Sequence, residues 1–367
     1  MKKRIAIIGA NEFQNPLILK AKEMGFETYV YAWKSGDIGE KTADHFIPIS
    51  IIEKEKIWES CKNNKVASCV SIGSDLATHT VNYIQRKLGN PCNPLITDTI
   101  ATNKYEMRKA LLNAGIVCPR FLKATEVPKS EKLKDFSYPL IIKPVDRSGS
   151  RGIYKVNNYF ELCEVINYSC KLSFSKEAII EEFIDGNEYS CESISFAGKH
   201  TILQITKKFT TGAPHFIETG HKEPSDLADE YIGKIKNQIT KALTALQITY
   251  GASHSEFKVD KEGNVHIIEI GARMGGDCIG SDLVHLSTGF DFVRMVIDTS
   301  LGIEPSFDLI NEPKESFINF IFTLNDIEKY NEIKNKYNII REKIDYKNIS
   351  EKVTDSSSRH GYYIFTK

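Results

Sequence analysis

Strand-forming and helix-forming stretches alternate over the first ninety residues, and this alternation constrains the fold of the chain more than any other feature. Short apolar runs at 5–8, 27–32 and 66–72 predict strands, and helical patterns at 16–24 and 53–63 predict the helices between them. Strands that alternate with helices favour a parallel sheet covered by helices on both faces. The chain is therefore expected to begin with an α/β unit.

The turn after the first predicted strand lacks the signature of a dinucleotide site. Its sequence is Gly9-Ala10-Asn11 rather than a Gly-x-Gly-x-x-Gly loop. The second strand ends at Ala32-Trp33, without an acidic residue to hold a ribose. We therefore expect this unit to be structural, or to contribute a wall to a site elsewhere.

The rest of the chain mixes strands and helices in a less regular order. Asn93 and Pro94 mark a boundary, after which Asp98 is predicted to cap one helix that carries Lys104 and ends near Asn113. Further predicted strands lie near 140–144, 178–184 and 190–220, helices near 159–168, 231–246 and 290–301, and a closing segment from about 312. The fold class is thus α/β combined with α+β.

Charge and cysteine content argue against several classes of protein. Lys plus Arg and Asp plus Glu both number 48, so no net charge predicts nucleic acid or an anionic membrane as a partner. No apolar run approaches the length needed to span a bilayer. The eight cysteines include no CxxC pair and no metal-type spacing, which is typical of reduced thiols in a cytoplasmic protein.

One segment is predicted to place two glutamates opposite each other. A polar hairpin turn lies between two β-rich runs, and symmetric pairing about Glu262 and Gly263 makes Glu256 face Glu269. Their Cβ atoms would lie about 4.5–5.5 Å apart. Because facing carboxylates repel each other, a cation is expected between them. Oxygen ligands of this kind, with Arg273 just beyond, suit Mg²⁺ carrying phosphate.

A simpler interpretation of the two glutamates stays open. Lys258 lies two residues from Glu256 and points to the same face of the strand. It could neutralise the two acids as part of an ordinary surface ladder of charges. The case for a metal therefore depends on what else the chain carries.

A small polar loop at 146–152 is a candidate phosphate site. Its Gly and Ser residues let backbone N–H groups approach oxygens closely, and Arg147 and Arg151 lie within it. Lys143, at the end of the preceding strand, can reach a phosphate as a point charge. No GK[ST] sequence ends a glycine loop, so this is not a P-loop. A Gly/Ser loop of this kind can equally be an ordinary turn.

The strand that contains Glu181, Glu182, Phe183 and Ile184 leaves through a glycine turn. Its edge therefore offers free backbone groups that could bind a purine ring. Glu188 follows the turn and is placed to accept hydrogen bonds from ribose hydroxyls. Together with the loop and the two facing glutamates, this segment predicts a nucleotide site.

In their order and spacing, these motifs resemble the ATP-grasp superfamily of carboxylate–amine ligases. The matching string is Lys104, IIKP, SGSRG, EEFIDGNE, SEF and EIGARMGG, spread over residues 95–305. The resemblance implies a Rossmann-like N-terminal domain followed by a two-lobed ATP-grasp fold and a small C-terminal segment. The implied domains are the Rossmann-like domain at 1–95, the linker helix and small lobe at 96–190, the large lobe with the metal site at 191–311, and the C-terminal subdomain at 312–367.

The resemblance also implies a role for each matching residue. Lys104 and Lys143 would hold the ATP phosphates, and Glu256 and Glu269 would bind Mg²⁺, with two ions expected and Mn²⁺ as the alternative metal. The other implied nucleotide contacts are Ser148, Gly149, Ser150, Gly152, Glu181, Glu182, Phe183, Ile184 and Glu188. Many members carry asparagine two residues after the second metal glutamate. This chain has Gly271 there, which implies a weaker metal site.

Ligases of this superfamily transfer the γ-phosphoryl group to a substrate carboxylate, and an amine then displaces phosphate. Lys143 and Arg273 are the expected catalytic residues, with Arg273 stabilising the acylphosphate and the oxyanion. The alternative for Arg273 is a structural clamp on the preceding strand.

The glycine-bracketed segment 211–221 resembles a segment of amino-acid and dipeptide ligases. Glu218 could hold a substrate ammonium, and His221 could accept a proton from the attacking amine. Both could equally be ordinary loop residues whose hydrogen bonds are satisfied within the protein. Gly275 and Gly276 complete the expected substrate contacts.

The leading hypothesis is an ATP-dependent ligase that joins small, amino-acid-like carboxylate and amine substrates into an amide or peptide bond. Homodimers are common in the resembled superfamily, and no nucleic acid or membrane partner is expected. One alternative is a bicarbonate-activating enzyme of the biotin carboxylase or carbamoyl-phosphate type. The other is a non-catalytic ATP-binding module whose altered metal site no longer supports transfer.

Overall fold

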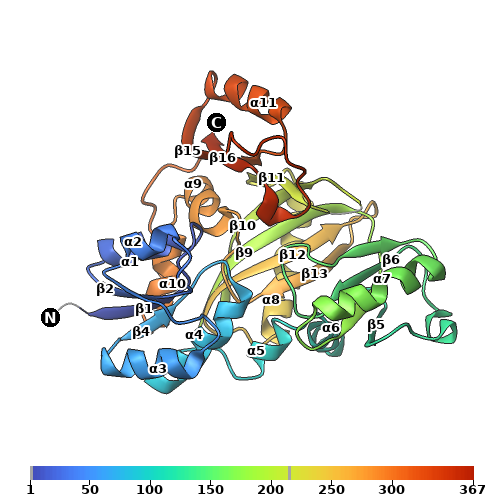
Figure 1. The fold of residues 1–367 in the computed structure, drawn as a ribbon, viewed down its shortest axis with the longest axis horizontal. Coiled ribbons are helices and arrows are strands. Elements are labelled where there is room, and N and C mark those ends of the chain that lie inside the picture. The colour runs from blue at the N-terminus through green and yellow to red at the C-terminus, as the bar shows by residue number, and fades with distance from the viewer. Residues whose placement is uncertain (1–2, 214–215) are drawn as a thin grey trace.

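The computed structural model describes residues 3–213 and 216–367, and these form three β-sheets (Figure 1). A four-stranded N-terminal sheet lies at the left of Figure 1, an eight-stranded central sheet in the middle, and a four-stranded small sheet at the right. Of the helices within the described ranges, none combines the length and apolar character needed to cross a membrane.

The N-terminal sheet is parallel, as the alternation predicts, with the strand order β3-β2-β1-β4. Ile5 and Ile7 of β1 pack against α1 and α10, and Ala6 and Ile8 pack against α3 and α4, so helices cover both faces. The elements are β1 (Arg4–Ile8), α1 (Asn15–Glu23), β2 (Glu27–Tyr31), α2 (Ile38–Thr42), β3 (His45–Ile47), α3 (Lys54–Asn63), β4 (Ser68–Val70), α4 (Asp75–Leu88) and, later in the chain, α10 (Phe292–Ser300).

The prediction of one helix starting at Asp98 is wrong, because the chain forms two helices there, α5 (Thr97–Ile100) and α6 (Lys104–Asn113). Asp98 does not cap the longer one. Its carboxylate accepts hydrogen bonds from Asn82 at 2.7 Å and Arg86 at 2.5 Å. Asn103 caps α6 instead, since its side-chain oxygen accepts hydrogen bonds from the first-turn backbone N–H groups of Tyr105 and Glu106.

The small sheet is antiparallel, with the order β5-β8-β6-β7, and helix α7 packs on one of its faces. Its elements are β5 (Phe121–Ala124), β6 (Leu140–Pro144), β7 (Tyr154–Val156), α7 (Tyr159–Leu172) and β8 (Ala178–Glu182). The Gly/Ser loop at 146–152 joins β6 to β7, so it leaves this sheet at one end.

The central sheet is antiparallel, and its strand order is β13-β12-β9-β10-β11-β14-β16-β15. The C-terminal strands therefore extend the same sheet that carries the glutamate hairpin (Figure 1). Its elements are β9 (Asn187–Phe196), β10 (Lys199–Thr210), β11 (Glu218–Glu223), α8 (Asp229–Ala245), β12 (Gly251–Val259), β13 (Val265–Gly271), the π-helical turn Ile279–Leu283, α9 (Val284–Thr288), β14 (Ser316–Phe320), α11 (Leu324–Lys334), β15 (Asn338–Ile344) and β16 (Gly361–Thr366).

The two faces of the central sheet have different coverings. Phe257 and other inward residues pack on α6 and α8, whereas Ile194 and Ala252 pack on α10 together with residues of the N-terminal sheet. Side chains alternate between the faces along a strand, so His254 and Glu256 share the second face with Ala252. This places polar side chains on the face next to the N-terminal sheet.

Candidate active site

The predicted pairing of the two glutamates is confirmed: Glu256 on β12 lies directly opposite Glu269 on β13. A bulge follows at Glu256/Phe257, which shifts the register of the remaining pairs. The turn is closed by Asp260, whose carboxylate accepts hydrogen bonds from the backbone of Glu262. The hairpin thus presents two carboxylates side by side at its open end.

Two lysines from other elements hold these carboxylates. Lys104 Nζ, at the start of α6, donates to Glu269 Oε1 at 2.8 Å, and Lys208 Nζ on β10 donates to Glu256 Oε1 at 2.6 Å. Lys258 does not provide the surface ladder considered from the sequence. It donates to the backbone oxygen of Ile184 at 3.3 Å instead.

Lys208 was not singled out from the sequence, although it lies at the centre of the acidic site. Its side chain is 3% exposed, and its Nζ lies 3.7 Å from Glu188, 3.6 Å from Glu218 and 2.6 Å from Glu256. Burial alone would lower the pKa of Lys208, but the carboxylates of Glu256, Glu218 and Glu188 outweigh it and raise that pKa. One signal in the sequence could have identified Lys208. Side chains alternate between the two faces of a strand, so one of the adjacent Lys207 and Lys208 must face inward.

A second buried pair supports the hairpin: Glu192 on the neighbouring strand β9 contacts His254 on β12 of the hairpin. Glu192 Oε1 contacts His254 Nδ1, and His254 Nε2 lies 3.3 Å from Glu256 Oε1. Burial lowers the pKa of His254, but the two carboxylates raise it to about 9, so the ring carries a positive charge at neutral pH. Glu192 Oε2 also accepts the backbone N–H of Gly275 at 2.8 Å.

Position 275 must be glycine because the backbone there passes very close to the Glu192–His254 pair. A Cβ at that position would lie 2.6 Å from Glu192 Oε1 and 2.8 Å from His254 Nδ1. The first residue of the predicted glycine pair therefore lets the chain pass over the buried Glu192–His254 pair. The adjacent Gly276 has open space around it.

Glu181 and Lys143 meet in a buried ion cluster that also contains Arg108. Arg108 Nε donates to Glu181 Oε1 at 2.5 Å, and Lys143 Nζ donates to Glu181 Oε2 at 2.6 Å. Burial alone would raise the pKa of Glu181, but the two cations hold it at about 2. Arg108 was missed from the sequence, since nothing in α6 marks which cation faces the small sheet.

The Gly/Ser loop folds back toward Lys104. The backbone oxygen of Arg147 accepts from Lys104 Nζ at 2.7 Å. Ser150 has a φ of 57° and Gly149 a φ of 71°, so consecutive residues adopt the left-handed conformation that turns the loop. Asp146 anchors the loop start by accepting from the backbone N–H of Phe174 at 3.0 Å.

These groups line two adjoining cavities between the small sheet and the central sheet. The first cavity is lined by Lys143, residues 181–184, Glu188 and Ile268. Both cavities are bordered by Glu256 and Glu269. The second is lined by Lys104, Arg147, Ser148, Gly149, Ser150, Ile153, Glu218, His254, Glu256, Glu269, Gly271 and Arg273. The predicted nucleotide and metal residues are therefore brought together, except Gly152, which packs against Pro144 and Leu172.

Glu218 lines both site cavities, whereas the predicted His221 lines neither of them. Glu218 accepts from Ser356 Oγ at 3.0 Å. His221 is buried, and its Nε2 lies 4.0 Å from Asp277 Oδ2, which also accepts from Arg359. His215, in the same predicted segment, lies outside the described residues.

Arg273 forms a bidentate ion pair with Asp75, a residue of the N-terminal unit that was not expected at the site. Arg273 Nε lies 2.8 Å from Asp75 Oδ1, and Nη2 lies 3.0 Å from Oδ2. A third donor, Nη1, bonds the backbone oxygen of Met274 at 3.1 Å. The arginine is thus clamped to the N-terminal unit, while it still lines the site cavity.

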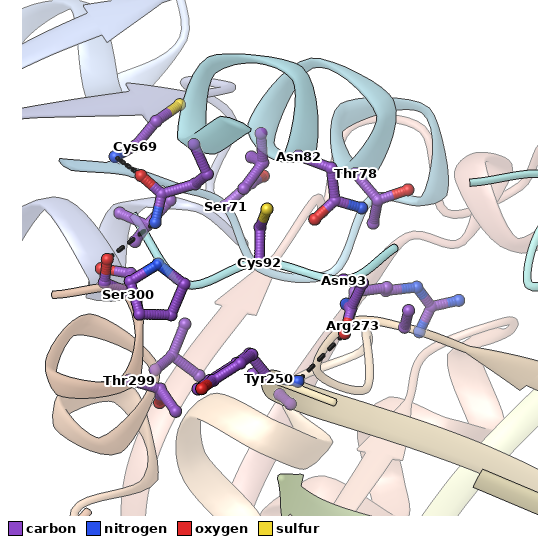
Figure 2. Close-up of a pocket in the computed structure, with 18 residues that line it drawn as sticks. Cys69, Ser71, Thr78, Asn82, Cys92, Asn93, Tyr250, Arg273, Thr299 and Ser300 are labelled. Carbon is purple, nitrogen blue, oxygen red and sulfur yellow. Dashed lines mark hydrogen bonds between the residues drawn. The ribbon is translucent and has the colours of Figure 1, made fainter. Parts of the chain in front are cut away.

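Figure 2 shows a further cavity, lined in part by Arg273, between the N-terminal unit and strand β12. Its polar lining is already engaged across this junction: Gln85 donates to the backbone oxygen of Ser300 at 2.7 Å, and Asn93 accepts from the backbone N–H of Tyr250 at 3.0 Å. The N-terminal unit is therefore held against the end of α10 and against the residue that precedes β12.

The donor set fits magnesium bound together with phosphate. Within residues 3–213 and 216–367, no group of three His, Cys, Asp or Glu side chains is arranged to hold a metal by itself. Glu256 and Glu269 offer two facing carboxylates in one cavity with residues of the Gly/Ser loop. Mg²⁺ is usually bound by one or two carboxylates plus substrate phosphates, so this arrangement suits it.

Comparison with known proteins relates this geometry to a family. Residues 136–282 match the model of the ATP-grasp domain. The D-alanine–D-alanine ligase of Acetivibrio thermocellus is 33% identical over 147 residues, 38% of this chain and 38% of that protein. The carbamoyl phosphate synthase large chain of Thermoanaerobacter sp. is 24% identical over 273 residues, 72% of this chain and 24% of that protein. The chain thus spans well under half the length of these two relatives.

The fold as a whole is found in a solved structure. An L-amino acid ligase from Bacillus licheniformis superimposes with a TM-score of 0.83 at 22% identity, covering 100% of this chain and 93% of that chain. The expected combination of a Rossmann-like sheet with a two-lobed ATP-grasp fold is therefore confirmed. The matched residues contain the Gly/Ser loop, residues 181–188 and both facing glutamates. Residues 136–282 are therefore similar to the ATP-grasp domain, and the chain as a whole has the fold of that solved structure.

Proposed function

We propose that this protein is an ATP-dependent carboxylate–amine ligase that forms an amide or peptide bond through an acylphosphate. The observation that carries the proposal is the pair Glu256 and Glu269, which face each other in one cavity with Lys104, the phosphate loop and Arg273. Transfer of a γ-phosphoryl group requires acids that bind a metal ion, cations that bind the phosphates and a group that stabilises the developing negative charge. The two glutamates, the lysines and Arg273 would fill these roles.

The nucleotide would lie across the two adjoining cavities. The backbone of 181–184 would bind the adenine and Glu188 the ribose, which places the phosphates under residues 148–150 between Lys104 and Lys143. Glu181 and Glu182 would help to shape the adenine end. Magnesium bound to Glu256 and Glu269, as two ions or with Mn²⁺ in its place, would neutralise the charge of the terminal phosphates.

The reaction would proceed in two steps. A substrate carboxylate oxygen attacks the γ-phosphorus, the bond to the β-phosphate oxygen breaks, and ADP leaves. The amine then attacks the acyl carbon, and the tetrahedral intermediate expels phosphate and loses a proton. Arg273 would stabilise the acylphosphate and the oxyanion, and its place in the lining of the cavity that holds the glutamates supports this role.

The substrates proposed are amino-acid-like. Glu218 borders the cavity and could bind a substrate ammonium. The buried His221 Nδ1 has no hydrogen-bond partner among the described atoms, and burial holds its pKa below the usual value, so the neutral ring could accept the amine proton. The ligases named above act on amino acids by their titles, which supports the same class here.

We also propose the domain boundaries 1–95, 96–190, 191–311 and 312–367, a cytoplasmic location and a homodimeric assembly. The boundary near 95 follows the change from the N-terminal sheet to the small sheet, and the boundary near 190 follows the change to the central sheet, which the strands after 312 continue. Size-exclusion chromatography with light scattering would measure the assembly state.

The proposal is tested by measuring ADP and phosphate release with Mg²⁺ against pairs of amino acids. Turnover should require both a carboxylate and an amine, and Glu269→Ala should lower it by at least about 100-fold because the metal loses a ligand. Glu262→Ala, in the hairpin turn, is the matched control and should retain activity. Release of AMP, or equal turnover by wild type and Glu269→Ala, would contradict the proposal.

A bicarbonate-activating enzyme is the second candidate, and one observation favours it. The similarity to the carbamoyl phosphate synthase large chain covers 72% of this chain, more than the similarity to the D-alanine ligase does. Bicarbonate would then replace the amino-acid carboxylate as the phosphoryl acceptor. ADP release that depends on bicarbonate, and on no amino acid, would favour this candidate.

A further inference from the structure

We propose that Asp75, in the N-terminal unit, is a positioning residue of the active site that fixes the guanidinium of Arg273. This inference rests on the proposed ligase function, because it assigns Arg273 a partner for that reaction. It makes the N-terminal unit a contributor to the chemistry rather than only a wall of the site.

The first observation is the geometry of the ion pair. Both carboxylate oxygens of Asp75 bond Arg273, at 2.8 Å to Nε and 3.0 Å to Nη2. A bidentate pair restricts the plane of the guanidinium as well as its position. The two side chains are 16% and 20% exposed, so solvent screens the pair only weakly.

The second observation is where Asp75 comes from. Asp75 is the first residue of α4, a helix of 14 residues that packs on the N-terminal sheet. Its neighbour Ser74 caps this helix by accepting the backbone N–H of Ala77. The carboxylate is therefore held by a rigid element, and it lines a pocket that also contains Lys104 and Glu269.

The third observation is the space that Asp75 occupies. Gly271 ends strand β13, two residues after Glu269, in a strand conformation that any residue can adopt. A Cβ at Gly271 would lie 2.9 Å from Asp75 Oδ1 and 3.3 Å from Arg273 Nε. The absence of a side chain at 271 thus leaves room for the carboxylate that reaches Arg273 from the N-terminal unit.

The Arg273 ion pair is distinct from a second ion pair, which joins α1 of the N-terminal unit to the start of α10. Lys20 of α1 donates to Asp291 at 2.9 Å, beside the first turn of α10 and outside the residues that line the site cavity. Lys20→Ala removes an ion pair of the same kind without touching Arg273. It is the matched control for a merely structural role.

The test compares kcat and KM for Asp75→Ala, Gly271→Ala, the double variant and Lys20→Ala. Asp75→Ala should lower kcat by about 10- to 100-fold, because a misplaced catalytic group costs this much, with KM for ATP within about twofold of wild type. Gly271→Ala should also lower kcat by pushing the carboxylate aside. In the Asp75→Ala background it should cost little more, because the Asp75 oxygen, the atom nearest to the added Cβ, is then absent.

A readout that does not depend on turnover is the rate at which phenylglyoxal modifies Arg273, followed by peptide mass spectrometry. The rate should rise in Asp75→Ala and in Gly271→Ala, and it should match wild type in Lys20→Ala. Wild-type kcat in Asp75→Ala, an unchanged labelling rate, or additive losses in the double variant would overturn the proposal. If the wild-type protein turns over no carboxylate and amine pair, the ligase function fails, and the labelling rate alone decides whether Asp75 holds Arg273.

Discussion

Arg108 is a buried cation that joins two strands of the site through its hydrogen bonds. It is 1% exposed and its guanidinium bonds both Glu181 and the backbone oxygen of Ile268. Arg108→Met should lower the free energy of unfolding by about 3 kcal/mol, because it leaves a buried carboxylate with one cation fewer. Urea denaturation measures this loss.

The adjacent Lys109 is the control for that experiment. Its ion pair with Glu106 is exposed on the surface of the same helix. Lys109→Met should change the free energy of unfolding by less than about 1 kcal/mol. Equal losses in the two variants would show that the buried cluster contributes no more than a surface pair.

Glu223 should make stability depend on pH. It is fully buried and hydrogen-bonded with Thr206 and Ser287, and burial raises its pKa to about 8. Its folded pKa lies above its unfolded value of 4.5, so the folded state binds more protons between these values. Stability should therefore fall as the pH rises from about 5 to 8.

Glu223→Gln imitates the protonated carboxyl and should remove most of this dependence. The variant should exceed wild type in free energy of unfolding by about 1–3 kcal/mol at pH 8 and differ little at pH 5. Urea denaturation at the two pH values measures both. A parallel fall in wild type and variant would assign the pH dependence to other groups.

The residues alone predicted the pairing of Glu256 with Glu269, because both lie in one hairpin. They did not predict Lys208, which contacts Glu256 from a distant segment. Glu256 and Glu269 are joined by a short turn, so the strand period fixes their pairing. Lys208, by contrast, reaches Glu256 from a strand 48 positions earlier. Nothing local to either residue reports that contact, since it depends on the strand order of the central sheet.

At the scale of elements, the N-cap of α6 connects helix stability to the site. Asn103 caps the helix, and the next residue, Lys104, bonds Glu269. Asn103→Ala should lower the free energy of unfolding by about 1 kcal/mol. It should also raise KM for ATP, because the first turn that places Lys104 becomes less ordered.

Asn158 provides the matched comparison, because it caps α7, and neither it nor that first turn lines the site cavities. Asn158→Ala should cost a similar free energy of unfolding but leave KM for ATP unchanged. If both variants raise KM equally, the effect comes from general loss of stability rather than from Lys104.

The same region explains where element prediction failed. Asp98 as an N-cap predicted one helix ending near Asn113, but the Asp98 carboxylate accepts hydrogen bonds from Arg86 and Asn82 of the N-terminal unit, and the chain breaks between α5 and α6. A tertiary contact therefore overrode a good local capping signal. Strands β1, β2 and β4 of the N-terminal sheet were predictable because their burial on both faces makes them continuous apolar runs, whereas the three-residue, partly exposed strand β3 was not predicted.

For the whole molecule, the N-terminal and central sheets share one core through α10. Residues of β1, β9, β12 and α10 pack in the same apolar cluster. The chain contains two tryptophans, Trp33 and Trp58, and both belong to the N-terminal unit. Their fluorescence change in urea should therefore coincide with the main far-ultraviolet circular dichroism transition. Separate midpoints would mean that the N-terminal unit unfolds independently.

The lysines that hold the facing glutamates have a consequence for the metal-free protein. Lys104 and Lys208 act as internal counter-ions, so the acids are already compensated before any ligand arrives. Chelation with EDTA should leave the melting temperature unchanged, which differential scanning calorimetry measures; a fall of several degrees would show that the fold relies on a bound ion. In the proposed ligase, nucleotide binding would then be an exchange of partners, in which the Lys104 ammonium would turn from Glu269 to a phosphate and a divalent cation would replace it at the carboxylate.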